Sequence, residues 1–150
     1  MPSEEKDPLS KQEYDKIGNL LLDLVKGCPF IPEKVPVQYQ SIDAVESIGI
    51  YTLPGAKYLK RNVIGGFTAQ IKFQIAYRSF PTSNDQRINS QAKVDTIMSW
   101  LEEYGTMQKL SGGRTITKIT ASNSLPYKDK AGGDKSTIFA ADAVMEYEKD

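Results

Sequence analysis

Two stretches of the chain repeat hydrophobic side chains at the spacing of a helix. In the first, apolar or aromatic residues recur at Tyr14, Ile17, Leu21, Leu24 and Val25. This spacing predicts a helix over about residues 10–26, with Ser10 and Glu13 as a capping box at its start. Gly18 inside this segment indicates close packing against a neighbouring element. A second amphipathic stripe predicts a helix over about residues 85–104.

Alternation of apolar and polar residues marks the strands. It is longest over residues 67–78, where every second position is apolar and the positions between are mostly polar, so that one face meets the core. Residues 136–147 form the other long strand, and the β-branched residues in 114–122 predict a third. Shorter strands are predicted over 35–39, where nearby prolines confine the strand to a sheet edge, and over 47–53.

The segments between these elements are rich in proline, glycine and charge. We expect residues 1–9 to form a flexible N-terminal arm, and residues 54–66 and 123–135 to form loops. The order of elements is then helix, short strands, long strand, helix, strand and long strand. This order predicts an α+β fold: a single small domain over residues 10–150, with a mainly antiparallel sheet and two helices packed on one face.

The composition leaves little material for enzyme chemistry. The 150 residues include no histidine and one cysteine, which excludes imidazole bases, histidine metal ligands, disulfides within the chain and cysteine zinc sites. Cys28 has no histidine to activate it, and the glycine pairs lack the spacing of a phosphate-binding loop. We therefore expect a protein that is not an enzyme, with no catalytic residue, no cofactor and no metal.

Hydropathy and the N-terminal residues indicate an intracellular protein. No apolar run approaches the ~20 residues of a membrane-spanning helix. The first residues carry charges of both signs and lack the apolar centre of a signal peptide. We therefore expect no membrane partner.

Charge is balanced over the whole chain but not along it. There are 19 basic and 19 acidic side chains, so the formal net charge is zero, which argues against a general nucleic-acid binder. Residues 1–46, 79–108 and 136–150 carry an acidic excess, whereas residues 47–78 and 109–135 carry a basic one. Alternating blocks of opposite sign suit a protein whose faces meet copies of itself and other partners.

A small set of residues is predicted to contact another subunit or partner. Trp100 lies off the centre of the second helical stripe, which leaves it as either the edge of the core or an interface anchor. Asp142 interrupts an apolar strand face, as an edge or interface residue paired with lysine or arginine would. Basic side chains beside aromatic ones occupy two further segments, which are either solvated or in contact with protein or nucleic acid. The candidates in these segments are Lys57, Lys60, Arg61, Tyr127, Lys128 and Lys130.

The order of the elements, and the segments that form them, resemble a family of phage proteins. The segments are YDKIGNLLLDLV, GFTAQIKFQIAYRS, INSQAKVDTIMSWLEE, ITKITASNSLP and STIFAADAVMEYE. Over about Ser10–Tyr147 the chain is similar to the tail terminator proteins of long-tailed bacteriophages, a group that includes minor capsid (tail-completion) proteins. The family has no invariant site residues, so the resemblance transfers none.

The resemblance implies a virion structural protein at the head–tail junction, assembled in the host cytoplasm. Its copies would form a hexameric ring that caps the tail tube, stops tube polymerisation and presents a surface to the head-completion (stopper) protein. The implied partners are other copies of the chain, the major tail tube protein, the stopper, and DNA that passes through the lumen without sequence-specific binding. The alternatives are a head-completion or other connector protein and, in another class, a small bacterial regulatory or ligand-binding α+β domain.

Overall fold

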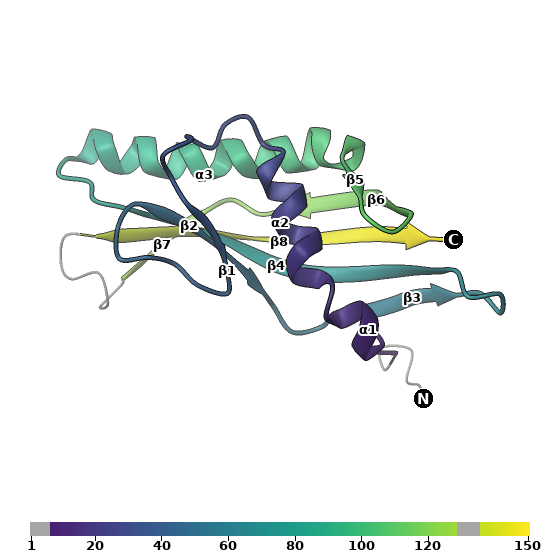
Figure 1. Cartoon of the computed structure of the whole chain (residues 1–150). Coiled ribbons are helices and arrows are strands. Elements are labelled where there is room, and N and C mark those ends of the chain that lie inside the picture. The colour runs from purple at the N-terminus through teal and green to yellow at the C-terminus, as the bar shows by residue number, and fades with distance from the viewer. Residues whose placement is uncertain (1–6, 129–135) are drawn as a thin grey trace.

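The computed structural model describes residues 7–128 and 136–150. In chain order the elements are α1 (Lys11–Tyr14), α2 (Ile17–Lys26), β1 (Val37–Tyr39), β2 (Ser47–Thr52), β3 (Lys57–Arg61), β4 (Phe67–Ser79), α3 (Asn84–Tyr104), η1 (Gly105–Met107), β5 (Lys109–Leu110), β6 (Arg114–Ala121), β7 (Leu125–Lys128) and β8 (Thr137–Lys149). The described residues form one eight-stranded, mainly antiparallel sheet, with α2 and α3 on one face (Figure 1). This arrangement confirms the predicted α+β class and the single small domain.

Two long strands form the centre of the sheet and set its length. β4 and β8 run antiparallel along their whole length, with Phe67 opposite Lys149 and Ser79 opposite Thr137. β2 and β3 lie end to end along the other edge of β4, and β6 and β7 lie end to end along the other edge of β8. β1 adds a parallel partner to β2 at one margin, and β5 adds an antiparallel partner to β6 at the other.

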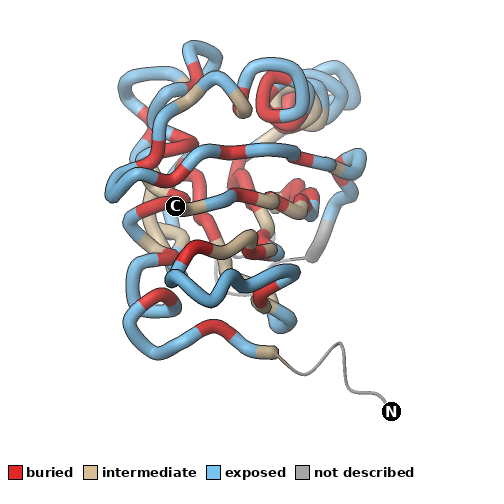
Figure 2. The backbone as a smooth tube through the Cα atoms, turned by 90° about the vertical axis from the view of Figure 1, so that its right-hand side faces the viewer, coloured by how far each residue is buried: buried red, intermediate tan, exposed pale blue. Residues whose placement is uncertain are grey.

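The hydrophobic core lies between the sheet and the helices. The odd-numbered residues of β4 from Ala69 to Tyr77, and of β8 from Phe139 to Tyr147, face this core, because side chains alternate along a strand. Figure 2 shows the buried stretches gathered in the middle of the molecule, with exposed turns around the outside. On the other side of the sheet lies what we call the open face, whose side chains are partly or fully exposed: Gln70, Lys72, Gln74, Asp142, Val144 and Glu146.

The first helix is interrupted where the sequence predicts a continuous helix over residues 10–26. α1 ends at Tyr14, a turn follows, and α2 begins at Ile17. The turn gives Glu13 the buried position in place of Tyr14: Glu13 is 5% exposed and Tyr14 is 54% exposed. The Ser10 hydroxyl accepts a hydrogen bond from the Glu13 backbone N–H at 3.2 Å. The Glu13 carboxylate binds other groups, so only half of the predicted capping box forms.

Helix α2 passes close to β1 at Gly18. A Cβ atom at this position would lie 2.8 Å from Cε2 of Tyr39, which is too close for an ordinary contact. The Tyr39 ring is held in place by a 2.6 Å hydrogen bond between its hydroxyl and that of Thr52. These contacts confirm the close packing predicted for Gly18.

Two strands lie in segments that the sequence assigns to loops. β3 falls within the predicted loop 54–66, and β7 falls within the predicted loop 123–135. β4 and β8 have 13 residues each, whereas β2 has 6 and β6 has 8. Each long strand therefore extends beyond its shorter neighbour, and its remaining backbone groups pair with β3 or β7 after a break in the neighbouring edge. Leu53 and Ser122 bridge the breaks, since their N–H groups donate to β4 and β8 at 2.8 and 2.9 Å.

The described part of the predicted N-terminal arm lies along β3. The backbone N–H of Tyr58 donates to the carbonyl of Asp7 at 2.9 Å, and Pro8 bridges to Lys57. Leu9 is 9% exposed and packs with the core. Residues 1–6 and 129–135, which make up the rest of this arm and of the second predicted loop, lie outside the described residues.

Candidate interface surfaces

Trp100 lies on the buried side of α3. Its side chain is 7% exposed and belongs to the hydrophobic core. Helix α3 packs there against β6, β8 and β4. Of the two roles that the sequence leaves open for Trp100, the structure shows the packing role within the subunit.

Asp142 lies near the middle of the open face and is exposed. Its Oδ1 accepts a hydrogen bond from Nε2 of Gln74 at 3.1 Å. Its backbone N–H donates to the Ser122 hydroxyl at 3.0 Å, at the break between β6 and β7. Among the described residues, neither lysine nor arginine forms an ion pair with it, so its carboxylate is available to a cation on another molecule.

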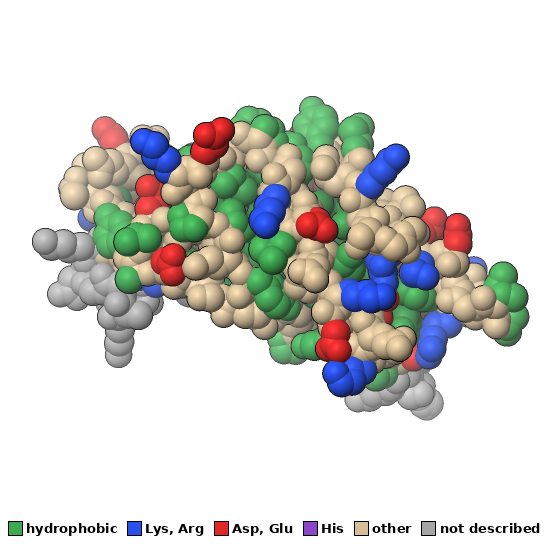
Figure 3. Space-filling model, viewed as in Figure 1, with side chains coloured by type: hydrophobic (Ala, Val, Ile, Leu, Met, Phe, Trp, Pro, Cys, Tyr) green, Lys and Arg blue, Asp and Glu red, His purple; other side chains and the backbone are tan. Residues whose placement is uncertain are grey.

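β3 carries the first group of basic candidates. Nη1 of Arg61 lies 3.3 Å from Oδ1 of Asp7, and its guanidinium carbon lies 4.4 Å from the centre of the Tyr58 ring. Lys60 is exposed, and Lys57 is half-buried. Figure 3 shows basic side chains gathered at the end of the molecule where Figure 1 places α1 and β3. Asp7, Glu148 and Asp150 lie at the same end, so this end of the sheet carries charges of both signs.

The second group of basic candidates lies at the other end of the sheet. Tyr127 and Lys128 belong to β7, whose register places Lys128 opposite Thr137 at the start of β8. β3 pairs instead with residues 67–70 of β4, which lie beside the end of β8. The structure therefore separates two segments that look alike in the sequence. Lys130 lies outside the described residues.

A buried ionic cluster joins the N-terminal helix to the sheet. Arg114 holds the Glu13 carboxylate with two hydrogen bonds, from Nη2 to Oε1 at 2.6 Å and from Nε to Oε2 at 2.8 Å. Tyr147 donates its hydroxyl to Oε2 at 2.6 Å. The side chains of Glu13 and Arg114 are 6% and 2% exposed. The sequence patterns did not predict this cluster. The signal available in the sequence was Glu13 itself, a charged residue one helical turn before Ile17 on the apolar stripe.

The surroundings of this cluster fix the protonation state of each member. Burial raises the pKa of Glu13, but hydrogen bonds from Arg114 and Tyr147 and the charge of Arg114 outweigh burial and leave that pKa below its usual value. The hydrogen bond to Glu13 raises the pKa of Arg114. Burial, followed by the hydrogen bond to Glu13, raises the pKa of Tyr147. At neutral pH the cluster is an ion pair with a neutral tyrosine, which suits a structural tie.

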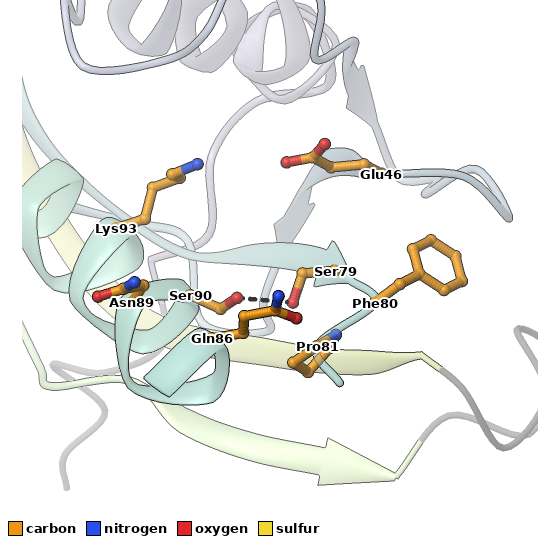
Figure 4. Close-up of a pocket in the computed structure, with 8 residues that line it drawn as sticks. All are labelled: Glu46, Ser79, Phe80, Pro81, Gln86, Asn89, Ser90 and Lys93. Atoms are coloured by element: carbon orange, nitrogen blue, oxygen red, sulfur yellow. Dashed lines mark hydrogen bonds between the residues drawn. The ribbon is translucent and has the colours of Figure 1, made fainter. Parts of the chain in front are cut away.

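A pocket of about 320 Å³ lies where β4 ends and α3 begins (Figure 4). It is lined by Glu46, Ser79, Phe80, Pro81, Gln86, Asn89, Ser90 and Lys93. Inside it the Ser79 hydroxyl donates to the Ser90 hydroxyl at 2.9 Å. Phe80 is 41% exposed, so the pocket combines an apolar wall with polar groups.

Two opposite charges flank this pocket and meet at one tyrosine. Glu46 accepts a hydrogen bond from the Tyr77 hydroxyl. Lys93 donates to the same hydroxyl at 3.5 Å, and its Nζ lies 5.3 Å from the centre of the Tyr77 ring. Burial, with the hydrogen bond to Glu46 and its negative charge, raises the pKa of Tyr77. Tyr77 is therefore a neutral link between α3 and the residues that precede β2.

Other chemistry-bearing groups are few in the part of the chain that the structure describes. Residues 7–128 and 136–150 hold no cluster of three or more acidic or cysteine side chains that could bind a metal ion. None of the described helices is both long and apolar enough to cross a membrane. Cys28 is buried with a free thiol, and burial raises the pKa of that thiol. A thiol with a raised pKa stays protonated at neutral pH and is a weak nucleophile.

Comparisons with known proteins identify the fold of the chain. No protein-family model and no curated protein matches it. Among solved structures, a chain of the virion of a native gene transfer agent particle is similar, with a TM-score of 0.60 and 10% sequence identity over 93% of this chain and 99% of that chain. A second solved chain is 19% identical over 93% of this chain and 95% of that chain, with a TM-score of 0.46. At 10% identity, the first likeness shows a shared fold.

Proposed function

We propose that this chain is a structural component of a phage-like virion. The observation that carries the proposal is the shared fold with a chain of the gene transfer agent virion, which spans 93% of this chain and 99% of that one. Because one fold can serve several functions, the surface of the chain is the second line of support. Exposed charged residues of both signs gather at the end of the sheet that holds β3, and exposed apolar residues occur at both ends, as in a protein that contacts several partners.

Within the virion, our proposal is the tail-terminator role that the sequence resemblance implies. Copies of the chain form a hexameric ring at the head–tail junction, cap the tail tube, stop its polymerisation and contact the stopper protein. Two features of the chain support this role. Asp142 and the basic strand β3 lie at different points along β4, because Asp142 is opposite Gln74 whereas β3 pairs with residues 67–70, which suits unlike contacts with two neighbours. The zero net charge suits a lumen through which DNA slides without being held.

The mass of the purified full chain, measured alone and with tail tubes, tests this proposal. We expect a closed ring by native mass spectrometry, and rings at one end of the tubes by electron microscopy. A chain that remains monomeric and binds neither tail tube nor head protein refutes the proposal. Rings that bind the head-completion protein but ignore tubes indicate a connector of the head side instead.

A further inference from the structure

The turn between β3 and β4 ends in two fully exposed aliphatic side chains. Val63 is 104% exposed and Ile64 is 90% exposed. They occupy the central positions of a turn that the Gly65 N–H closes by donating to the Asn62 carbonyl at 3.2 Å. Such positions favour glycine, proline, asparagine, aspartate and serine. Valine and isoleucine therefore stabilise neither the turn nor the core of this subunit, which points to a contact outside it.

The turn is held in a defined position by its hairpin. The Asn62 N–H donates to the Gly66 carbonyl at 2.7 Å, directly before β4 begins. A Cβ on Gly66 would lie 3.1 Å from the Lys149 carbonyl, so the base of the turn packs against the end of β8. Figure 3 shows hydrophobic side chains at the right-hand end of the molecule, where Figure 1 places this turn. An apolar tip that is already ordered loses little conformational freedom on binding.

The opposite end of β4 offers a surface that can receive such a tip. The pocket of about 320 Å³ is lined by Phe80 and Pro81, which follow β4 directly. Phe80 is 41% exposed, so one apolar side chain that lines the pocket is left partly uncovered by its own subunit.

The tip and the pocket cannot meet within one subunit. β4 has 13 residues and separates them, and at 3.3 Å per residue this distance is about 40 Å. Figure 1 shows the turn at one end of the molecule and the start of α3 at the other. A contact between the tip of one copy and the pocket of the next is therefore head-to-tail. Contacts of this kind use different surfaces on each copy and can close into a ring.

We propose that Val63 and Ile64 of one copy insert into the pocket beside Phe80 of the next copy. The contact relies on apolar surface, because the pocket is lined by charges of both signs, Glu46 and Lys93. This inference rests on the proposed function, because the contact would build the ring that is proposed there. The contact itself can be tested on the purified chain without tail tubes.

Acidic substitutions at the tip test whether it makes the contact between copies. Val63→Asp with Ile64→Asp adds charge at two exposed positions, so the circular dichroism spectrum and melting temperature are expected to stay unchanged. We expect this variant, and Phe80→Asp at the receiving end, to sediment as monomers under conditions in which the unmodified chain assembles. Met107→Asp is the matched control, because Met107 is 72% exposed and apolar but belongs to η1. This control should assemble normally.

Cysteine cross-linking tests the pairing directly. Ile64→Cys with Phe80→Cys gives each copy one thiol at each end of β4, and mild oxidation should produce a covalent ladder beyond dimers. Each single-cysteine variant should stop at dimers, because a copy then has one exposed thiol; Cys28 is buried. A double variant that also stops at dimers, or tip variants that assemble like the unmodified chain, overturn the inference. Tip variants that still form rings but no longer bind tail tubes also overturn the inference, since the tip then contacts the tube protein. That result leaves the proposed function intact.

Discussion

Replacement of Arg114 by methionine should destabilise the fold more than most single substitutions. Arg114→Met keeps an apolar chain at this position but leaves the Glu13 carboxylate buried without its cation. Removing one partner of a buried ion pair costs about 3–5 kcal/mol. We expect a loss of this size because the Glu13 and Arg114 side chains are 6% and 2% exposed and their charged atoms lie 2.6 Å apart. For a domain of this size, the melting temperature should fall on the order of 10 °C.

Thermal and urea unfolding followed by circular dichroism measure this loss, and three further variants locate its cause. Tyr147→Phe removes one hydrogen bond to the carboxylate and should cost less, about 1.5–3 kcal/mol. Combining Glu13→Gln with Arg114→Met removes both charges, so it should recover part of the stability. Lys11→Met breaks the Lys11–Asp15 pair, whose side chains are 88% and 59% exposed, and should have little effect. The reasoning is refuted if Arg114→Met melts no lower than Lys11→Met.

Four further outcomes are expected. The folded-state pKa of Glu13 lies below its unfolded value, so the ionised carboxylate stabilises the fold above about pH 4.3. This stabilisation is lost as the pH falls through the folded pKa. The urea midpoint should therefore fall more steeply between pH 7 and pH 3 for the unmodified chain than for Glu13→Gln. Gly49→Ala would place a Cβ 2.5 Å from the Ser41 carbonyl oxygen, so thermal unfolding should show a loss of about 1–3 kcal/mol. Trp100→Ala empties a core position, and urea unfolding should show a loss of about 3–5 kcal/mol. Asp142→Lys reverses an exposed charge, so the melting temperature should hold while size-exclusion chromatography shows weaker assembly.

The long elements could be predicted because their patterns are local. Alternation over 67–78 and 136–147 gave strands within two residues of β4 and β8, and the stripe over 85–104 gave α3 to within one residue. β3 and β7 carry no such pattern: their sequences, KYLKR and LPYK, are short and contain charge or proline. These segments are strands because the edges of β4 and β8 extend past β2 and β6, a fact of tertiary pairing rather than of propensity.

The candidate contact residues were harder to predict than the fold. Hydrophobic stripes place Trp100 on α3 but leave open which way its ring packs, and the structure buries it. The cluster around Glu13 joins residues 101 and 134 positions apart, and no local pattern encodes pairs at such separations. Val63 and Ile64 lie in a segment predicted as a loop, where their apolar character is visible but their full exposure is not.

Side chains of α3 bind backbone groups at the outer edge of the sheet where β6 ends and β7 begins. Gln91 donates Nε2 to the Ser124 carbonyl at 3.0 Å. The Ser124 N–H in turn donates to Asp95 at 2.8 Å, and the Ala121 N–H donates to Glu102 at 2.8 Å. An edge with free backbone groups would invite a strand from another molecule. These side chains satisfy backbone groups of Ala121 and Ser124 within the subunit.

The opposite edge is occupied in a similar way, and this limits how copies can meet. Along β3, the Asp7 carbonyl accepts the Tyr58 N–H at 2.9 Å. With backbone groups satisfied at these points of both long edges, joining the sheets of two copies side by side is disfavoured. The ends of β4 differ, because they present exposed side chains: Val63 and Ile64 at one end and Phe80 at the other. Assembly through these ends uses apolar surface that the subunit leaves uncovered, which favours a head-to-tail contact over an extended sheet.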